Sequence, residues 1–570
     1  WAVGGDVLVV PSTVDGLDIS LYNDYTKTTP VQTGEYAYPW SYVAEPYVAT
    51  TMEAQNADSE AWYKWTVEGH TQGYGQSIDV AFTSVGWNNV LLTEKKNGKV
   101  TSSVAIKVMV KYVRREIRSM TDRDREAMFS AIMVMQRVPT DVGQALYGEK
   151  YYSKDYFTRI HQSYGGSSDC DHWHQGAGFV TSHFAYTLMY EAAMQAVDSS
   201  VSMPYWDFTL ESTFYTPNDW RNSPVFSNDW FGDASPPNDM HIVTEGRWGF
   251  NSVMVNAQNY STTNPYGMMR SPWNHDSTPF MTRSDKIYGY LNNVKPSGCQ
   301  QYHTTLQTDN WMHLSHLLNA ATHGHIHETI GGAWDNIYPE FLNGTVSPAV
   351  YTFAHSIQPL ARILWRNDLL ECPDSCDMTT DPKDCMCTCS EEKMAGRASY
   401  EILDSSGILE SVEYFDHDGH LLNSFYNEST GKIEYSLPHY THEESMDIYD
   451  GLLKLCCAPG KIGDQYDSNS PNDVTFWMLH PTMERIWHYM RMAPVVYNET
   501  WDPYHTCYGH NPDDLQPFRN LFDDNNEYYS NSDLYSLLHP QNEDLPYIYD
   551  NFEWPHCELL GYDMSATYRR

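Results

Sequence analysis

Apolar and polar residues alternate along parts of the first 113 residues. The alternation is clearest at 78–82 and 104–110, and an Asn97-Gly98 pair, which favours a tight hairpin turn, lies between these runs. A period of two places every second side chain on the same face of a β-strand, so that one face can be buried. The pattern therefore predicts a β-sandwich module over residues 1–113.

The spacing of apolar residues becomes helical from about residue 114. Thr121 opens a segment that resembles a helix N-terminal cap, and Met128, Ile132 and Met135 then recur at helical spacing. Further helices are predicted at 179–197, 309–328 and 473–491. A mainly helical region is thus expected over 114–339, and it resumes at 471–510.

Residues 340–470 interrupt the helical pattern with turn-rich sequence. Two strand-like runs, at 412–415 and 432–436, predict a β-hairpin within this segment. Most of the eleven cysteines also lie here: Cys372, Cys376, Cys385, Cys387, Cys389, Cys456 and Cys457. Such crowding is typical of a disulfide knot or of a thiolate metal site, and the absence of the separated cysteine pairs of a zinc ribbon favours disulfides. The segment is therefore interpreted as a cysteine-rich insertion.

Residues 511–570 form an acidic, tyrosine-rich tail punctuated by prolines. Cys507 and Cys557 are available to attach this tail to the rest of the chain, and the odd number of cysteines leaves one without a partner in the chain. Together these patterns predict a multidomain α+β protein.

Charge and composition narrow the choice of partners. The chain has 35 basic and 74 acidic residues, a net charge of −39, which repels nucleic acid. No apolar run approaches the roughly 18 residues of a transmembrane span. The cysteines and four glycosylation sequons, at Asn259, Asn343, Asn427 and Asn498, favour a secreted, extracellular glycoprotein. The start at Trp1 indicates a processed product, and Arg569-Arg570 is consistent with dibasic cleavage or with chance.

Several histidines are placed where they can bind metal. His323 and His327 lie four residues apart, so on a helix their imidazoles share one face and can hold one ion, whereas His325 points elsewhere. His174 is expected in a glycine-containing loop, and His183 on the helix that follows it, so that both could bind a second ion. Two further histidines complete the two sets of three: His161, for which His172 is the alternative, and His480.

Three segments that contain five of these histidines resemble the tyrosinase, catechol oxidase and molluscan haemocyanin superfamily. His174, His183 and Glu191, followed by the run from Met203 to Phe208, resemble the first copper motif of this superfamily. Residues 323–332 resemble the first half of its second motif, and residues 473–487 resemble the end of that motif. Residues 113–125 are similar to the opening of the same domain, whereas the first 110 residues and the insertion lie outside the resemblance.

The resemblance implies a type 3 dicopper centre inside a four-helix-bundle core. It assigns His161, His174 and His183 to one copper ion and His323, His327 and His480 to the other. Three neutral imidazoles per ion suit both oxidation states of copper and leave an open face for dioxygen. Glu191 and Asp207 are expected to orient helices rather than to touch metal.

The implied activity is oxidation of phenolic small molecules by dioxygen. Gly324 stands where relatives that hydroxylate monophenols often carry Asn, and no acidic residue lies between Asp309 and Glu328 to act as a base. Cys170 lies four residues before His174 rather than two, which argues against the Cys-His thioether of some relatives. We therefore expect oxidation of o-diphenols to o-quinones rather than hydroxylation of monophenols.

Two other functions are compatible with the same residues. One is a non-enzymatic extracellular protein, either structural or oxygen-binding, in which the β-module, the insertion and the abundant tyrosines contact matrix or assembly partners. The other is a zinc hydrolase that uses His323, His325 and His327, which requires a non-helical segment and leaves the other motifs unexplained.

Overall fold

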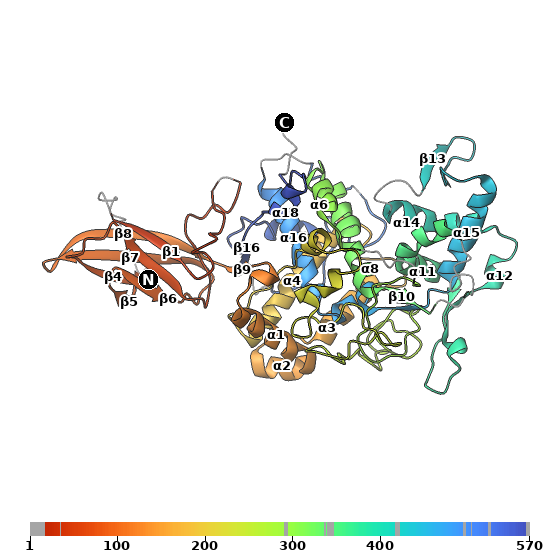
Figure 1. The fold of residues 1–570 in the computed structure, drawn as a ribbon, viewed down its shortest axis with the longest axis horizontal. Helices are drawn as coiled ribbons and strands as arrows, with labels where there is room; N and C mark the ends of the chain where they lie inside the picture. Colours follow the sequence, from red (N-terminus) through yellow and green to blue (C-terminus); the bar gives the residue numbers. More distant parts are fainter. Residues whose placement is uncertain are drawn as a thin grey trace, which may run out of the picture.

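The computed structural model describes residues 17–34, 36–289, 295–335, 338, 347–415, 422–493, 498–502, 504–522 and 526–565. Trp1, the Arg569-Arg570 pair and the Asn343 sequon lie outside this part of the chain. The described part is a mixed structure of helices and sheets. The N-terminal strands lie at one end, the helices that carry most of the histidines lie in the middle, and the insertion lies at the other end (Figure 1).

The N-terminal strands form two sheets with a shared core. One sheet has the order β2-β8-β7-β4-β5, and the other has the order β1-β3-β6. The strands are β1 (Asp18–Tyr22), β2 (Val43–Ala44), β3 (Thr50–Gln55), β4 (Trp62–Val67), β5 (His70–Tyr74), β6 (Ser77–Val80), β7 (Gly86–Lys96) and β8 (Lys99–Val110). Met52, Trp65 and Leu92, which come from both sheets, are fully buried in one cluster. The alternating pattern thus marks real strands, and Asn97 and Gly98 form the β7–β8 turn with positive φ.

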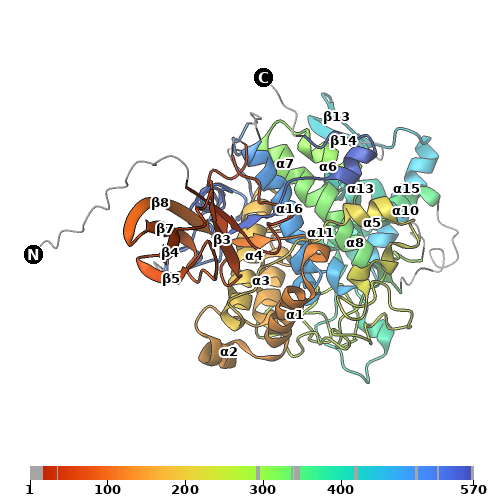
Figure 2. The ribbon, with the colours of Figure 1, turned by 60° about the vertical axis from the view of Figure 1, so that its left-hand side comes forward.

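The central region contains the predicted helices. They are α1 (Asp122–Arg137), α2 (Thr140–Tyr147), α3 (Lys154–Gly165), α4 (Gly178–Val197), α5 (Thr209–Phe214), α6 (Cys299–Leu306), α7 (Trp311–Leu317), α8 (His325–Gly331) and α16 (Phe476–Met492). The Thr121 side chain accepts a hydrogen bond from the Asp124 amide and so caps α1, as the sequence predicts. Helix α4 packs against α1 and α16, and a second view shows the N-terminal strands on one side of these helices (Figure 2).

The predicted helix at 309–328 is interrupted by a π-helical segment, Leu318–Gly324, between α7 and α8. The hydroxyl of Thr322 lies within hydrogen-bonding distance of the carbonyls of Leu317 and Leu318, five and four residues earlier. A π turn changes the angular position of the residues that follow it, and such turns are frequent at functional sites. Here the segment carries His323, one of the candidate ligands.

A buried ion pair network ties the central helices to the strands that flank them. The Arg114 guanidinium pairs with Glu191 of α4 and with Glu484 of α16, and all three side chains are fully buried. Arg114 ends β9 (Tyr112–Arg114), which pairs in parallel with β16 (Tyr547–Tyr549) of the tail. Glu191 therefore orients helices, as expected.

The insertion is helical where the sequence predicts its first strand. Residues 412–415 belong to α14 (Ile408–Phe415), so the predicted strand there is wrong. Ile408, Leu409 and Val412 are buried at helical spacing against the core of the insertion, and a window of four residues is too short to reveal that period. The hairpin does exist, but it joins β13 (Asn423–Asn427) to β14 (Lys432–Ser436).

The other elements are short, apart from two helices of the insertion. In the insertion and its flanks they are β10 (Ala333–Trp334), α10 (Pro348–Thr352), α11 (Ile357–Arg366), β11 (Leu370–Glu371), β12 (Thr388–Cys389), α12 (Glu391–Met394), α13 (Ser399–Ser405), α15 (His442–Cys457) and β15 (Lys461–Ile462). In the tail they are α17 (Asn531–Leu537) and α18 (Pro555–Leu559). The 3₁₀ turns are Ile117–Ser119, Trp220–Asn222, Pro224–Phe226, Ala354–Ser356, Pro382–Cys385, Asp464–Tyr466 and Ser470–Asn472.

Disulfides account for the crowded cysteines. The bonds are Cys372–Cys387, Cys376–Cys385, Cys389–Cys457, Cys170–Cys507 and Cys299–Cys557. The first three lie in the insertion and confirm the prediction of disulfides over a thiolate metal site. The last two attach the C-terminal region to the helical core. Cys456 is buried and is the free cysteine of the described residues.

None of the helices in the described part of the chain combines the length and the apolar character needed to cross a membrane.

Candidate metal centre

The structure brings the six predicted histidines together as two adjacent triples. The ligand atoms of His161, His174 and His183 all lie within 4.8 Å of one another, and we call this set the A triple. His323, His327 and His480 satisfy the same criterion and form the B triple. The rings of His183 and His480 are stacked with their centroids 4.9 Å apart, so the two triples line one buried chamber.

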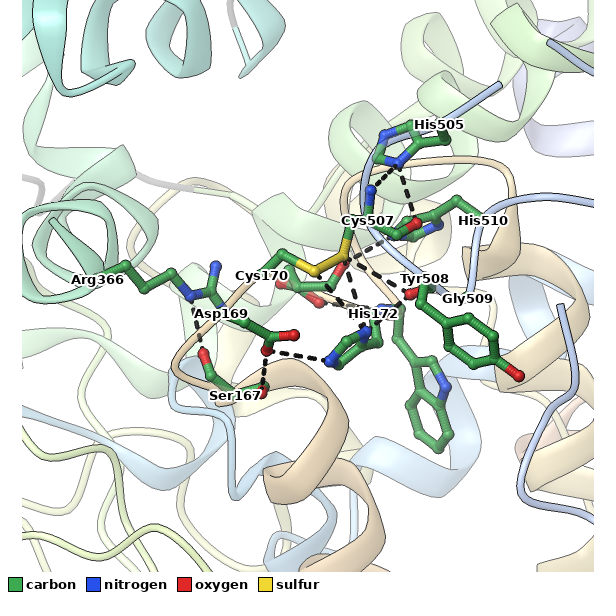
Figure 3. Close-up of a disulfide and its surroundings, with 12 residues drawn as sticks. Ser167, Asp169, Cys170, His172, Arg366, His505, Cys507, Tyr508, Gly509 and His510 are labelled. Atoms are coloured by element: carbon green, nitrogen blue, oxygen red, sulfur yellow. Dashed lines mark hydrogen bonds and ion pairs between the residues drawn. A yellow bond between two sulfur atoms is a disulfide. The ribbon is translucent and has the colours of Figure 1, made fainter. Parts of the chain in front are cut away.

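His161, rather than His172, belongs to the A triple. His161 lies on α3 and is almost fully buried. His172 points instead toward the Cys170–Cys507 disulfide, and its Nδ1 donates to the carbonyl of Tyr508 at 2.7 Å (Figure 3). The choice between His161 and His172 that the sequence left open is therefore decided by where the two side chains lie. Cys170 is bonded to Cys507, so its sulfur is not available for a thioether.

Every ring of the two triples donates a hydrogen bond through Nδ1. The acceptors are the carbonyl oxygens of Ser468 for His161, Phe179 for His183, Asn319 for His323, Gln465 for His327 and Phe476 for His480, and a carboxylate oxygen of Asp171 for His174. A carbonyl oxygen can only accept, so each ring carries its proton on Nδ1. The Nε2 lone pairs are therefore free to bind a metal ion, and the hydrogen bonds fix the orientation of the rings.

The Nε2 atoms of five of the rings face one another or lack a hydrogen-bond partner among the described residues. His323 Nε2 lies 2.9 Å from His480 Nε2 and 2.8 Å from His327 Nε2. Because all three rings are protonated on Nδ1, these atoms face one another with lone pairs and no proton to share. In the A triple, the Nε2 atoms of His161 and His183 are buried without a hydrogen-bond partner among the described residues. A metal ion in each triple would satisfy these lone pairs.

Burial favours the neutral form of five of these rings. Burial, followed by the neighbouring histidines, lowers the pKa of His161, His183, His323 and His480 well below the usual value. Burial lowers the pKa of His327 to about 4. Metal ions bind neutral imidazole, so the chamber holds ligands in the form that coordination needs.

His174 is held by a charged residue that the sequence analysis missed. Asp171 accepts from His174 Nδ1 at 2.9 Å and forms an ion pair with Arg362 of α11 at 2.6 Å. Burial by itself raises the pKa of Asp171, but Arg362 and His174 outweigh it and hold that pKa well below its usual range. The only signal in the sequence is that Asp171 stands three residues before His174.

The C-terminal region closes over the loop that carries His174. The Cys170–Cys507 disulfide joins the two segments, and His510 Nε2 donates to the carbonyl of Asp171 at 2.7 Å (Figure 3). At Gly178, a Cβ atom would lie 1.9 Å from the carbonyl oxygen of Gly509. Glycine is therefore required at this position, because a side chain would separate the segment of Gly509 from the loop of His174.

A cavity of about 470 Å³ reaches both triples. His161 and His174 of the A triple and His323 and His327 of the B triple contribute to its lining. The insertion supplies another part of the wall, including Pro359, Arg362 and Val412. A small molecule in this cavity would meet imidazoles from both triples.

His325 does not join His323 and His327. Its Nε2 donates to the carbonyl of Lys295 at 2.7 Å, and its Nδ1 faces Glu328 at 3.5 Å. The segment is helical throughout, so the zinc hydrolase hypothesis, which required a non-helical segment, is wrong. Asp207 accepts from the Thr209 amide at the start of α5 and lies outside both triples.

The central part of the chain matches a known family. Residues 152–349 match the model described as the common central domain of tyrosinase, and this stretch contains five of the six histidines. This part of the chain is therefore similar to the central domain of the tyrosinase family.

Similar proteins come from bacteria and animals. Grixazone synthase of Streptomyces griseus is 26% identical over 139 residues, which is 23% of this chain and 39% of that protein. A putative tyrosinase-like protein, tyr-3, of Caenorhabditis elegans is 26% identical over 165 residues, which is 28% of this chain and 19% of that protein. A functional unit from octopus haemocyanin aligns over 43% of this chain and 54% of that chain, with 19% identity and a TM-score of 0.23. The chain thus spans well under half the length of these curated relatives.

Proposed function

We propose that this chain binds two copper ions, one in each triple, and oxidises o-diphenols to o-quinones with dioxygen. The observation that carries the proposal is the cavity of about 470 Å³, whose lining includes imidazoles from both triples. Its volume falls within the range of about 300–1,000 Å³ that is usual for small-molecule sites. A phenolic substrate can therefore approach both metal positions from the same side.

The donor set supports copper. Six neutral imidazoles bind copper in both of its oxidation states, and members of the tyrosinase superfamily are copper proteins. When bound, the two copper ions would bind dioxygen and accept two electrons from the diphenol. The A ion would be held by His161, His174 and His183, and the B ion by His323, His327 and His480.

The protein's own contribution is to orient the rings and to exclude water. The six Nδ1 hydrogen bonds fix which nitrogen of each ring faces the ion. The ring centroids of Phe476 and His480 lie 3.9 Å apart, and those of Phe179 and His323 lie 4.6 Å apart. Apolar rings therefore close the side of the chamber. The site has no side chain at Gly324, and we propose that it therefore oxidises diphenols without hydroxylating monophenols.

The same proposal divides the chain into functional parts. We assign residues 1–113 to a β-sandwich module, 114–339 and 471–510 to a tyrosinase-like four-helix-bundle core, 340–470 to the cysteine-rich insertion and 511–570 to the tail. Five disulfides suit an oxidising compartment, which supports secretion and an extracellular location for a glycosylated protein.

Copper content and turnover test the function together. The copper-loaded chain is expected to contain two copper ions in the triples and to consume dioxygen when a small catechol is added. His327→Ala is expected to lose both the B copper ion and the oxidation. Copper at full occupancy in the unaltered chain without any catechol oxidation would contradict the enzyme proposal and indicate an oxygen-binding or structural protein instead.

A further inference from the structure

A third group of metal-ligand side chains lies at the cavity, outside both triples. The group consists of His325 and Glu328 on α8 and of His355 in the 3₁₀ turn Ala354–Ser356. One nitrogen of each histidine and one carboxylate oxygen of Glu328 lie within 4.8 Å of one another. All three line the same cavity. His355 belongs to the insertion and lies beyond the match to the family model, which ends at residue 349.

We propose that His325, Glu328 and His355 bind a third divalent metal ion of borderline softness, such as Zn²⁺, at the edge of the cavity. Two imidazoles and one carboxylate are a common ligand set for such ions, and the set leaves a coordination position open. The partly exposed side chains, 31% for His325 and 29% for His355, give that position access to the cavity.

The distances fit a tetrahedral ion. Bonds of about 2.0–2.1 Å from Zn²⁺ to nitrogen and oxygen place neighbouring ligand atoms about 3.3–3.4 Å apart. A carboxylate oxygen of Glu328 lies 3.0 Å from His355 Nδ1 and 3.5 Å from His325 Nδ1. Small shifts of the two side chains would bring both separations to the expected value.

The hydrogen bond on the far side of His325 supports coordination. His325 Nε2 donates to the carbonyl of Lys295 at 2.7 Å, which is the second hydrogen bond that metal-binding histidines usually make. Its Nδ1 faces a carboxylate oxygen of Glu328 at 3.5 Å, so a cation bound between the two atoms would take one bond from each.

An ion at this site would connect the insertion to α8. The site combines His325 and Glu328, which follow the π segment of the B triple, with His355 of the insertion. The bound ion would therefore fix the insertion as one wall of the cavity. Binding of metal only to the folded protein raises the melting temperature, and this gives a readout that does not depend on catalysis.

Metal stoichiometry tests the inference. The full-length chain is stripped with a chelator, titrated with Zn²⁺ alone, desalted and analysed for bound zinc per chain. We expect three equivalents in the unaltered chain and two in His355→Gln. His70→Gln, which changes an exposed histidine of β5, serves as the matched control and is expected to keep all three. Equal zinc content in the unaltered chain and a folded His355→Gln variant would overturn the inference.

Two further measurements keep the test decisive. In the unaltered chain, Co²⁺ is expected to give tetrahedral absorption bands that contain a component absent from His355→Gln, and Glu328→Gln is expected to lose the same component. If His355→Gln fails to fold, Glu328→Gln replaces it, and an unchanged cobalt spectrum in that variant overturns the site. His323→Ala separates this inference from the dicopper proposal, because it is expected to lose the B equivalent while keeping the equivalent that depends on His355.

Discussion

The two histidine triples are held in different ways. In the B triple, two of the three rings donate to carbonyls four residues earlier on their own helical segments, His323 to Asn319 and His480 to Phe476. In the A triple, only His183 does so. His174 lies in a loop that depends on Asp171, and Asp171 depends on an arginine of the insertion.

The A triple is therefore held in place by more contacts from distant parts of the chain than the B triple. The A triple is supported by the insertion through Arg362 and Ser468, and by the C-terminal region through Cys507 and His510. The B triple receives one such contact, from Gln465 to His327. Changes far from the chamber should therefore weaken the A ion first.

The largest expected effect follows from removing the central ring of the B triple. His323 Nε2 contacts both other rings of that triple, so His323→Ala is expected to lose one metal equivalent and to reduce catechol oxidation by at least about 100-fold. Metal analysis and oxygen uptake measure both effects. His313→Ala, which changes an exposed histidine of α7, is the control and should leave both values unchanged. Retention of two copper ions by the folded His323→Ala variant would exclude this ligand set.

Asp171→Asn should separate the two triples. The change weakens the acceptor for His174 Nδ1 and leaves the buried Arg362 charge uncompensated. We expect a loss of about 10–100-fold in affinity for the A ion, no change at the B ion and destabilisation of about 3–5 kcal/mol. Metal titrations and chemical denaturation measure these effects. The double variant with Arg362→Met should regain stability but not A-site affinity, and equal weakening of both ions would contradict the comparison.

Removal of the Cys170–Cys507 disulfide tests the contribution of the C-terminal region. The bond joins residues 337 positions apart, and its loss in the double serine variant is expected to cost about 2–5 kcal/mol. Because the bond fixes the loop of His174, the A ion should be lost to a chelator faster than the B ion. The matched control is the double serine variant of Cys376 and Cys385, which lie in the insertion and close a loop of only 9 positions. A similar rate of metal loss in both variants would show that the disulfide does not support the A triple.

Acid should weaken the contact that the same C-terminal region makes through His510. Burial lowers the pKa of His510 to about 4, below the value of about 6.5 in the unfolded chain, and its Nδ1 is buried without a partner among the described residues. Between these pH values the unfolded state binds the additional proton, so the contribution of His510 to stability is present above about pH 6.5 and is lost as the pH falls toward 4. This contribution amounts to roughly 3 kcal/mol. Denaturation from pH 7 to 4 should show a smaller loss of stability in His510→Gln than in the unaltered chain.

The sequence predicted the clustered histidines better than the residues that support them. Five of the six lie in the three motifs, whose spacing is a local property, whereas His161 was expected with His172 as the alternative. The partnership between Asp171 and Arg362 was not predicted, because it forms only when the insertion folds against α3 and the loop after it. The first strand of the predicted hairpin was placed too early for a related reason: the short run 412–415 fits either a strand or a helix, and burial of α14 decides between them.

The π-helical segment is a second feature that the sequence did not predict. The sequence indicated one helix over 309–328, and its extent is close to that of the combined segments from Trp311 to Gly331. An extra residue in one turn leaves no clear mark in apolar spacing, yet it sets the direction in which His323 points. Ligand identity could thus be predicted from residue order, whereas ligand orientation required the three-dimensional contacts.

The smallest expected effect concerns Gly324, between the two helical B ligands. A Cβ atom at this position would lie 3.4 Å from the carbonyl oxygen of Asn319, so a side chain fits with little adjustment. Gly324→Asn should therefore keep both metals and change the stability by less than about 1 kcal/mol, because Asn has a slightly higher helix propensity than Gly. If the missing amide is what restricts the site to diphenols, the variant should gain slow hydroxylation of a monophenol while its catechol oxidation stays within about threefold, a small change in free energy. Gly324→Ala, which adds only a methyl group, is the control, and hydroxylation in both variants or in neither would show that the amide at position 324 does not set this selectivity.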